Sequence, residues 1–247
     1  KNYVLDPISP ADIVRPEGDP NAKNYYYDFE KNGKTTRLFF LDAIDYYQEY
    51  DENGDITALE IRKSLGYTEE SAEDYTKYYN GRSYFGYSAS QVKWLAESLA
   101  ETDDFDDVMV FSHMGTDSST STAEFGAEVA DVMAAYNNKT AYKNEALEID
   151  VEYNDGGRIL SYQFGHMHVE ASLYSEDIDL WQISTSSANV DQTNVQTEEA
   201  LMSGTANVKT LPWRVFTRKL GTESEACFSV MSVSADRIYR YAVGVGN

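Results

Sequence analysis

The sequence has little cysteine, little positive charge and no long apolar run. Its one cysteine, Cys227, excludes an intrachain disulfide framework and a zinc site built on cysteines. The 20 Lys and Arg residues stand against 42 Asp and Glu residues, a formal net charge of -22. Nucleic acids and anionic membrane surfaces both bind clustered Lys and Arg. Since no run approaches the roughly 18–20 apolar residues that span a bilayer, we expect neither nucleic acid nor membrane as a partner.

The sequence does contain enough apolar residues for a folded core. Hydrophobic residues make up 42% of the chain and aromatic residues 13%, with 20 tyrosines. This composition excludes a wholly disordered chain. The 247 residues would fill one large domain or two small ones, and no linker marks a boundary. We expect residues 1–24, which hold four of the five prolines, to be an irregular lead-in and residues 25–247 to be the folded part.

Two helices are predicted from capping boxes that are followed by apolar residues at helical spacing. Ser88 and Gln91 form the first box, a Ser followed three residues later by Gln. The second box, residues 121–124, predicts a helix that opens there. The apolar stripes predict one buried face on each helix, with Val92, Leu95, Ala96 and Leu99 on the first and Phe125, Val129, Met133 and Tyr136 on the second.

Strands are predicted on both sides of these helices. Residues 25–29 and 37–42 are aromatic and apolar runs that flank a Gly-containing turn, which indicates a hairpin. Residues 108–111 are a short apolar run typical of a buried strand, and it places His113 at a strand end. We expect the acidic residues 101–107 to form a solvated loop. Further strands are expected at 147–153, 158–164, 169–174, 180–184, 213–217, 226–233 and 237–243, so the predicted fold class is α/β with much antiparallel strand.

Three histidines, His113, His166 and His168, are the residues with the clearest potential for chemistry. His166 and His168 lie two apart, so an extended backbone would send both imidazoles to the same face. Gly165 before them permits a backbone shape or a close approach that a side chain would block. Two imidazoles on one face are half of a transition-metal site, although two histidines on a solvated strand face would have the same spacing. The spacing therefore marks a candidate metal site.

Two motifs and their order along the chain carry a resemblance to a known family. The run from Val108 to His113 is an apolar strand that ends in a histidine, and residues 165–168 read Gly-His-Met-His. Together they resemble the calcineurin-like metallophosphoesterases, whose closing motif is Gly-His-x-His. The resemblance covers most of residues 25–243. It also includes a Tyr-rich strand and an R-x-x-x-L-D strand at 25–42, a Q-x-x-W-L helix at 91–95, and a last strand pair at 222–233 and 237–239.

The resemblance implies a fold and an activity. The fold is a two-layer β-sandwich flanked by helices, of which residues 25–247 would be the C-terminal portion. The activity is hydrolysis of phosphate mono- or diesters at two divalent ions about 3.5–4 Å apart, with a phosphate ester as the substrate. His113 and His166 would bind one ion and His168 the other. Manganese, iron and zinc suit oxygen-rich sites that contain imidazole.

The family's first three motifs, Asp-x-His, Gly-Asp-x-x-Asp and Gly-Asn-His-Asp/Glu, do not occur in this chain. The bridging Asp, a second acidic ligand, an Asn ligand and the proton-donating His are therefore missing, and no catalytic acid or base is assigned. We expect the chain to be the C-terminal part of a longer protein, inactive or weakly metal-binding alone. Loss of the first half would expose sheet edges and an apolar inner face. We therefore expect an N-terminal fragment of the same protein, or an oligomer partner, to cover them.

The sequence also allows other interpretations. The chain could be a non-catalytic binding or structural module on a degenerate metallophosphoesterase fold, or its three histidines could form one mononuclear zinc site with an open fourth position. Residues 49–60 fit most of a twelve-residue calcium loop but begin with Glu49 where Asp is expected, so we expect a polar turn there instead. Ser112 is not expected to be a nucleophile, because no Gly-x-Ser-x-Gly elbow occurs. The acidic, Tyr-, Ser- and Thr-rich composition leaves the compartment open, with a lean toward a secreted or surface protein.

Overall fold

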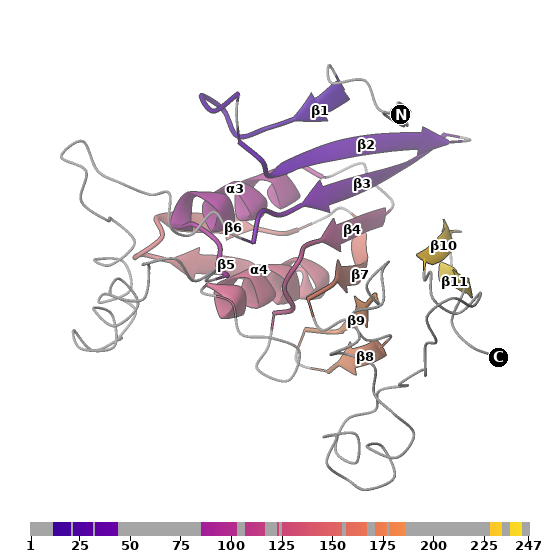
Figure 1. Ribbon diagram of the computed structural model, residues 1–247. Coiled ribbons are helices and arrows are strands. Elements are labelled where there is room, and N and C mark those ends of the chain that lie inside the picture. The colour runs from indigo at the N-terminus through magenta and orange to yellow at the C-terminus, as the bar shows by residue number, and fades with distance from the viewer. Residues whose placement is uncertain are drawn as a thin grey trace, which may run out of the picture.

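The structure is a computed structural model. It describes residues 12–20, 22–31, 33–43, 85–102, 107–116, 123, 125–154, 157–166, 171–176, 178–185, 228–233 and 238–243. Within them, seven strands form one mixed sheet in the order β1-β2-β3-β4-β7-β9-β8 (Figure 1). These strands are β1 (Ile13–Val14), β2 (Tyr25–Lys31), β3 (Lys34–Phe40), β4 (Asp107–Phe111), β7 (Arg158–Phe164), β8 (Ala171–Ser175) and β9 (Leu180–Ser184). With helices α3 (Ala89–Ala100) and α4 (Gly126–Asn138) they make an α/β fold, as the sequence predicts.

Four adjacent strands of this sheet, β3, β4, β7 and β9, run parallel. Their carboxyl ends therefore meet along one edge. The flanking strands are antiparallel, since β2 forms the predicted hairpin with β3 and β8 pairs with β9. Strand β1 pairs with β2, so the expectation that residues 1–24 are irregular throughout is wrong at Ile13 and Val14. Both are β-branched residues, which favour strands.

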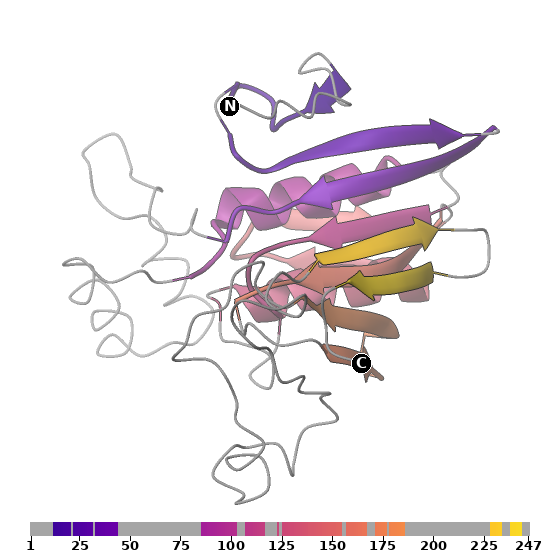
Figure 2. The ribbon, with the colours of Figure 1, turned by 45° about the vertical axis from the view of Figure 1, so that its right-hand side comes forward.

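Two hairpins in the described residues lie outside the seven-stranded sheet. Strand β5 (Ala141–Asn144) pairs with β6 (Ile149–Glu152), and β10 (Phe228–Val233) pairs with β11 (Ile238–Val243). Helices α3 and α4 cover one face of the sheet, and the β10–β11 hairpin lies on the opposite side (Figures 1 and 2). The layers therefore follow the order helix, sheet, hairpin. The strand predicted at 213–217 lies outside the described residues.

Only the first of the two predicted capping boxes opens a helix. The Ser88 hydroxyl oxygen accepts the Gln91 N–H at 3.1 Å at the start of α3. Helix α4 begins at Gly126, after Phe125 in a left-handed conformation (φ 54°) with no side-chain cap. A β-carbon on Gly126 would lie 3.5 Å from the Thr116 carbonyl oxygen. That distance is an ordinary contact. The predicted apolar face of α4 is buried as expected.

The main core lies between the helices and the sheet. Alternation along β3 and β4 sends Phe39 and Val110 to the helix face, where both are fully buried. Trp94 of α3 packs edge-on against Phe39, with ring centroids 5.7 Å apart. Burial of each such side chain contributes about 1.5–3 kcal/mol. Nowhere in the described part of the chain does a helix combine the length and apolar character that crossing a membrane requires.

Arg37 of β3 is a buried cation that links the β2–β3 hairpin to α3. Its side chain donates to both oxygens of the Asp28 carboxylate, at 2.8 and 2.9 Å. It also donates to the Ser98 carbonyl oxygen at 3.0 Å, and its guanidinium carbon lies 3.9 Å from the Tyr26 ring centroid. Since Arg37 is only 4% exposed, these partners replace the hydration that it loses on folding.

The acidic run at residues 101–107 is not the fully solvated loop that we expected. Thr102 is buried, and its hydroxyl lies 2.6 Å from the hydroxyl of Tyr136. Asp107 opens β4, is buried, and pairs with Lys34 at 2.5 Å. Residues 103–106 lie outside the described part of the chain. The strand takes in Asp107 because a paired carboxylate is far less costly to bury than an isolated one.

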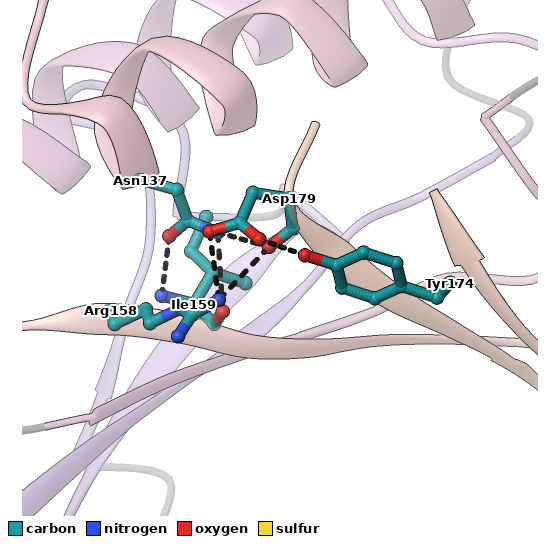
Figure 3. A network of polar contacts seen from close by, with 5 residues as sticks. All are labelled: Asn137, Arg158, Ile159, Tyr174 and Asp179. Carbon is teal, nitrogen blue, oxygen red and sulfur yellow. Dashed lines mark hydrogen bonds and ion pairs between the residues drawn. The ribbon is translucent and has the colours of Figure 1, made fainter. Parts of the chain in front are cut away.

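A polar cluster holds the end of α4 against the amino ends of β7 and β9 (Figure 3). Asn137 accepts the Ile159 N–H at 2.8 Å and donates to the Ile159 and Asp179 carbonyl oxygens, both at 3.3 Å. Arg158 pairs with the Asp179 carboxylate at 2.8 Å, and the Tyr174 hydroxyl donates to the same carboxylate. The Arg158 and Asp179 side chains are 56% and 42% exposed. An ion pair this exposed contributes little to stability.

We expect Arg37→Met to lower the free energy of unfolding by about 2–4 kcal/mol. The substitution leaves the buried Ser98 carbonyl without its donor and Asp28 without its partner. Arg158→Met is the matched control, because it removes a solvated ion pair, and its expected loss is below about 1 kcal/mol. Urea denaturation of both variants measures the two losses. Equal losses would contradict the structural role assigned to Arg37.

Candidate metal centre

Two of the three predicted histidines meet at the carboxyl edge of the sheet. His113 follows β4 and His166 follows β7, and these strands are parallel neighbours. Nδ1 of His166 lies 3.3 Å from Nε2 of His113, and the ring planes meet at 80°. Both side chains are exposed. His168 lies outside the described residues, so its role stays a prediction.

The spacing of the two ring nitrogens suits a shared metal ion. Imidazole nitrogens bind zinc at about 2.0–2.1 Å in tetrahedral sites, which puts two such nitrogens about 3.3–3.4 Å apart. The same separation also suits one N–H···N hydrogen bond between the rings, with one ring in the donating tautomer. In the metal-bound arrangement both nitrogens would point to one ion, whereas in the hydrogen-bonded arrangement the N–H of one ring points at the nitrogen of the other. The residues present therefore fit a divalent transition metal bound by nitrogen.

Backbone hydrogen bonds hold the two histidines at this separation. The pairing of β4 with β7 continues past the strand ends, because the Ser112 N–H donates to the Gln163 carbonyl at 2.9 Å. The Gly165 N–H then donates to the His113 carbonyl at 3.1 Å. The peptide of His113 is thus bonded to the residue directly before His166. The sheet itself therefore sets where the two imidazoles lie.

The special backbone of the Gly-His-x-His motif lies at His166 and not at Gly165. A β-carbon on Gly165 would meet His113 Nδ1 at 3.6 Å and its carbonyl oxygen at 3.8 Å, which are ordinary contacts. His166 adopts φ 59°, a left-handed conformation in which His is enriched among non-glycine residues. Strand β7 ends at Phe164, so the extended backbone that we expected to align His166 with His168 is absent at His166. Sequence spacing could not reveal this turn.

Phe85 packs against both imidazoles. Its ring centroid lies 5.2 Å from that of His113 and 4.7 Å from that of His166, edge-on in the second case. This half-buried ring is an apolar wall on one side of the pair, and by reducing hydration there it strengthens electrostatic interactions. The sequence did not point to Phe85, because it lies in a Tyr- and Phe-rich stretch where no spacing or motif distinguishes it.

Three hydroxyl groups gather around the neighbours of His113. The Tyr87 hydroxyl lies 2.8 Å from Ser112 Oγ and 2.8 Å from the Tyr162 hydroxyl. The Tyr162 hydroxyl donates to the Met114 carbonyl oxygen at 2.7 Å. Burial raises the pKa of Tyr87 to about 12 and the pKa of Tyr162 well above its usual value. Both phenols therefore stay protonated at neutral pH and can donate.

The described residues alone do not complete a metal site. Among them, no group of three or more His, Cys, Asp or Glu side chains lies close enough together to hold an ion. Further ligands for the His113–His166 pair would have to come from outside this part of the chain, and His168 is the nearest candidate in sequence. The calcium-like stretch at residues 49–60 also lies outside the described residues.

Comparisons with known proteins do not identify the chain. No protein-family model matches its sequence, and no curated protein matches it either. The likeness to the calcineurin-like metallophosphoesterases therefore rests on short motifs and their order along the chain.

Titration with Zn²⁺ should perturb His113 and His166 together. The chain has three histidines, so single substitutions assign each imidazole signal in a proton–nitrogen correlation spectrum. If the two rings are ligands of one ion, as we expect, both shift with one midpoint. His113→Ala should weaken the effect at His166 by more than about tenfold, and His168→Ala tests the third ligand. Separate midpoints, or an unchanged response of His166 in His113→Ala, would contradict a shared ion.

Gly165→Ala should change the free energy of unfolding by less than about 1 kcal/mol, because its backbone is not left-handed and a β-carbon meets only ordinary contacts. Gly33→Ala is the control. Gly33 has φ +75° in the β2–β3 turn, so a side chain there should cost about 1–2 kcal/mol. Thermal or urea unfolding compares the two variants. A larger loss of unfolding free energy in Gly165→Ala than in Gly33→Ala would contradict this and would show that the motif requires glycine at residue 165.

Proposed function

We propose that this chain supplies the histidine ligands of a dinuclear, metal-dependent phosphoesterase of the calcineurin-like kind. The observation that carries the proposal is the 3.3 Å separation of His113 Nε2 and His166 Nδ1. This pair lies at the carboxyl ends of parallel strands, where open α/β sheets bind their ligands. The order of layers, with helices on one face of the sheet and a hairpin on the other, is compatible with a sandwich flanked by helices.

The chain's own residues would divide the work at this site. His113 and His166 would hold one divalent ion, manganese, iron or zinc, and His168 would reach a second. Phe85 would limit water on one side of the pair. Bound divalent ions supply polarisation of a phosphoryl oxygen and an activated water. The substrate would be a phosphate mono- or diester.

The acidic ligands of such a centre would come from a partner, either an N-terminal fragment of the same protein or an oligomer partner. The sheet face opposite the helices supports this, because alternation sends Phe29 and Trp181 to it and they are 46% and 48% exposed. Tyr25, Phe40 and Phe111 stack across the same face, with ring centroids 4.8 and 4.9 Å apart. The β10–β11 hairpin of the chain lies on this side of the sheet, and the aromatic surface that stays exposed at Phe29 and Trp181 is suited to binding another protein segment.

A mononuclear zinc site of His113, His166 and His168 is the second candidate. The observation that favours it is the 3.3 Å separation of the His113 and His166 ring nitrogens, which is the spacing of two ligands on a single tetrahedral ion. Such a site would keep a fourth position open for water or substrate. It would hold one ion per chain, whereas the phosphoesterase holds two.

Metal content and hydrolysis together test the proposal. We expect the chain, in complex with the partner that supplies the acidic ligands, to hold two ions and to hydrolyse p-nitrophenyl phosphate or its diester, with loss of activity in chelator. His113→Ala should lower turnover by at least about a hundredfold because it removes an ion ligand, while Arg158→Met at the opposite edge of the sheet should not. One ion without hydrolysis would favour the mononuclear zinc site. A protein that holds no ion would contradict both metal-site proposals and would indicate a non-catalytic module.

A further inference from the structure

The hydroxyls of Tyr87, Ser112 and Tyr162 form a closed ring of hydrogen bonds with the backbone of Met114. The Tyr162 hydroxyl lies 2.7 Å from the Met114 carbonyl oxygen, against 3.4 Å for that of Tyr87, so Tyr162 donates there. A phenol carries one proton. Tyr162 must therefore accept from Tyr87, which lies 2.8 Å away.

The same argument orients the rest of the ring. The Tyr87 hydroxyl donates its hydrogen bond to Tyr162. The 2.8 Å contact between Tyr87 and Ser112 therefore requires the Ser112 hydroxyl to donate. Ser112 Oγ in turn accepts the Met114 N–H at 3.4 Å. Each hydroxyl thus donates once and accepts once, and the ring begins and ends on Met114. Rings of this kind are cooperative, because each bond polarises the next.

The ring fixes the backbone on both sides of His113, the candidate metal ligand. Ser112 and Met114 are the two neighbours of His113, and the ring holds one through its side chain and the other through its backbone. Tyr87 and Tyr162 are fully buried, so water does not compete for these bonds. His113 is exposed at the surface, while its two neighbours are hydrogen-bonded to the buried phenols.

We propose that Tyr87, Tyr162 and Ser112 are positioning residues that hold His113 in register with His166 for metal binding. The inference rests on the proposed function, because holding His113 in register with His166 matters for activity only if the two histidines bind an ion. The hydrogen bonds of the phenols run to Ser112 Oγ and to the Met114 carbonyl oxygen, so the phenols act on His113 through the backbone at residues 112–114. A purely structural role would change stability and leave the metal site as it is.

The test uses matched Tyr→Phe substitutions, which remove one buried hydroxyl each. Tyr162→Phe and Tyr87→Phe break the ring, and Ser112→Ala is a third variant in case one phenol is required for folding. Tyr136→Phe and Tyr153→Phe are controls, since their hydroxyls bond to Thr102 at 2.6 Å and to the Ala96 carbonyl at 3.1 Å, away from His113. Circular dichroism and urea denaturation show that each variant is folded.

Co²⁺ is the probe, because its visible absorption reports ligand geometry. We expect the ring variants to bind Co²⁺ about 10–100-fold more weakly and with an altered spectrum, as loss of residues that orient ligands does elsewhere, and the controls to match the unsubstituted chain. Equal affinity and equal spectra in all variants would overturn the inference and leave the proposed function standing.

Amide hydrogen exchange gives a readout that needs no metal. The Gly165 N–H bonds to the His113 carbonyl, so its exchange should speed up in the ring variants and not in the controls. If neither the unsubstituted chain nor any variant binds Co²⁺ without the partner's acidic ligands, this measurement decides the positioning role by itself. Unchanged exchange at Gly165 in the ring variants would then overturn it.

Discussion

The parallel pairing of β4 with β7, carried past the end of each strand, is the constraint on which the candidate site depends. His113 and His166 are 53 residues apart in sequence, and closing a loop of that length costs conformational entropy. The hydrogen bonds between the paired strands and the burial of the apolar side chains on one face of the sheet offset this cost. The hydrogen bond from the Gly165 N–H to the His113 carbonyl oxygen then extends the pairing to the two histidines. The imidazoles meet because of strand register, and the contact between them is a consequence of it.

The sequence predicted much of the frame and part of the site. An apolar run before His113 predicts a buried strand, and a Ser88–Gln91 box predicts a helix, because both patterns act locally. Helix α4 begins after a left-handed Phe125, and His166 turns left-handed just after the end of β7, and local spacing predicts neither. Tyr87 and Tyr162 could not be singled out among 20 tyrosines, since only the fold brings their hydroxyls together.

Three of the scarce positive charges of this acidic chain are bound to partners at the sheet or at the end of α4. Arg37 and Lys34 each pair with a carboxylate at the sheet, and Lys139 donates to the Gly157 carbonyl at 2.5 Å while lying over the Tyr136 ring. The 42 Asp and Glu residues outnumber the 20 Lys and Arg residues, which gives the formal net charge of -22. A field of that sign draws cations toward the molecule and repels phosphate esters. Metal ions at the histidines would have to neutralise this repulsion for an anionic substrate to approach.

The hydroxyl ring around Met114 has only one possible direction of proton donation. An amide N–H can donate but not accept, and a carbonyl oxygen can accept but not donate, so the circuit cannot reverse. The three O–H dipoles at Ser112 and the Met114 backbone consequently keep one orientation, without the two-fold disorder of a free hydroxyl chain. They need not rotate when charge arrives at the neighbouring His113, so the reorganisation energy of that part of the site is small from the outset.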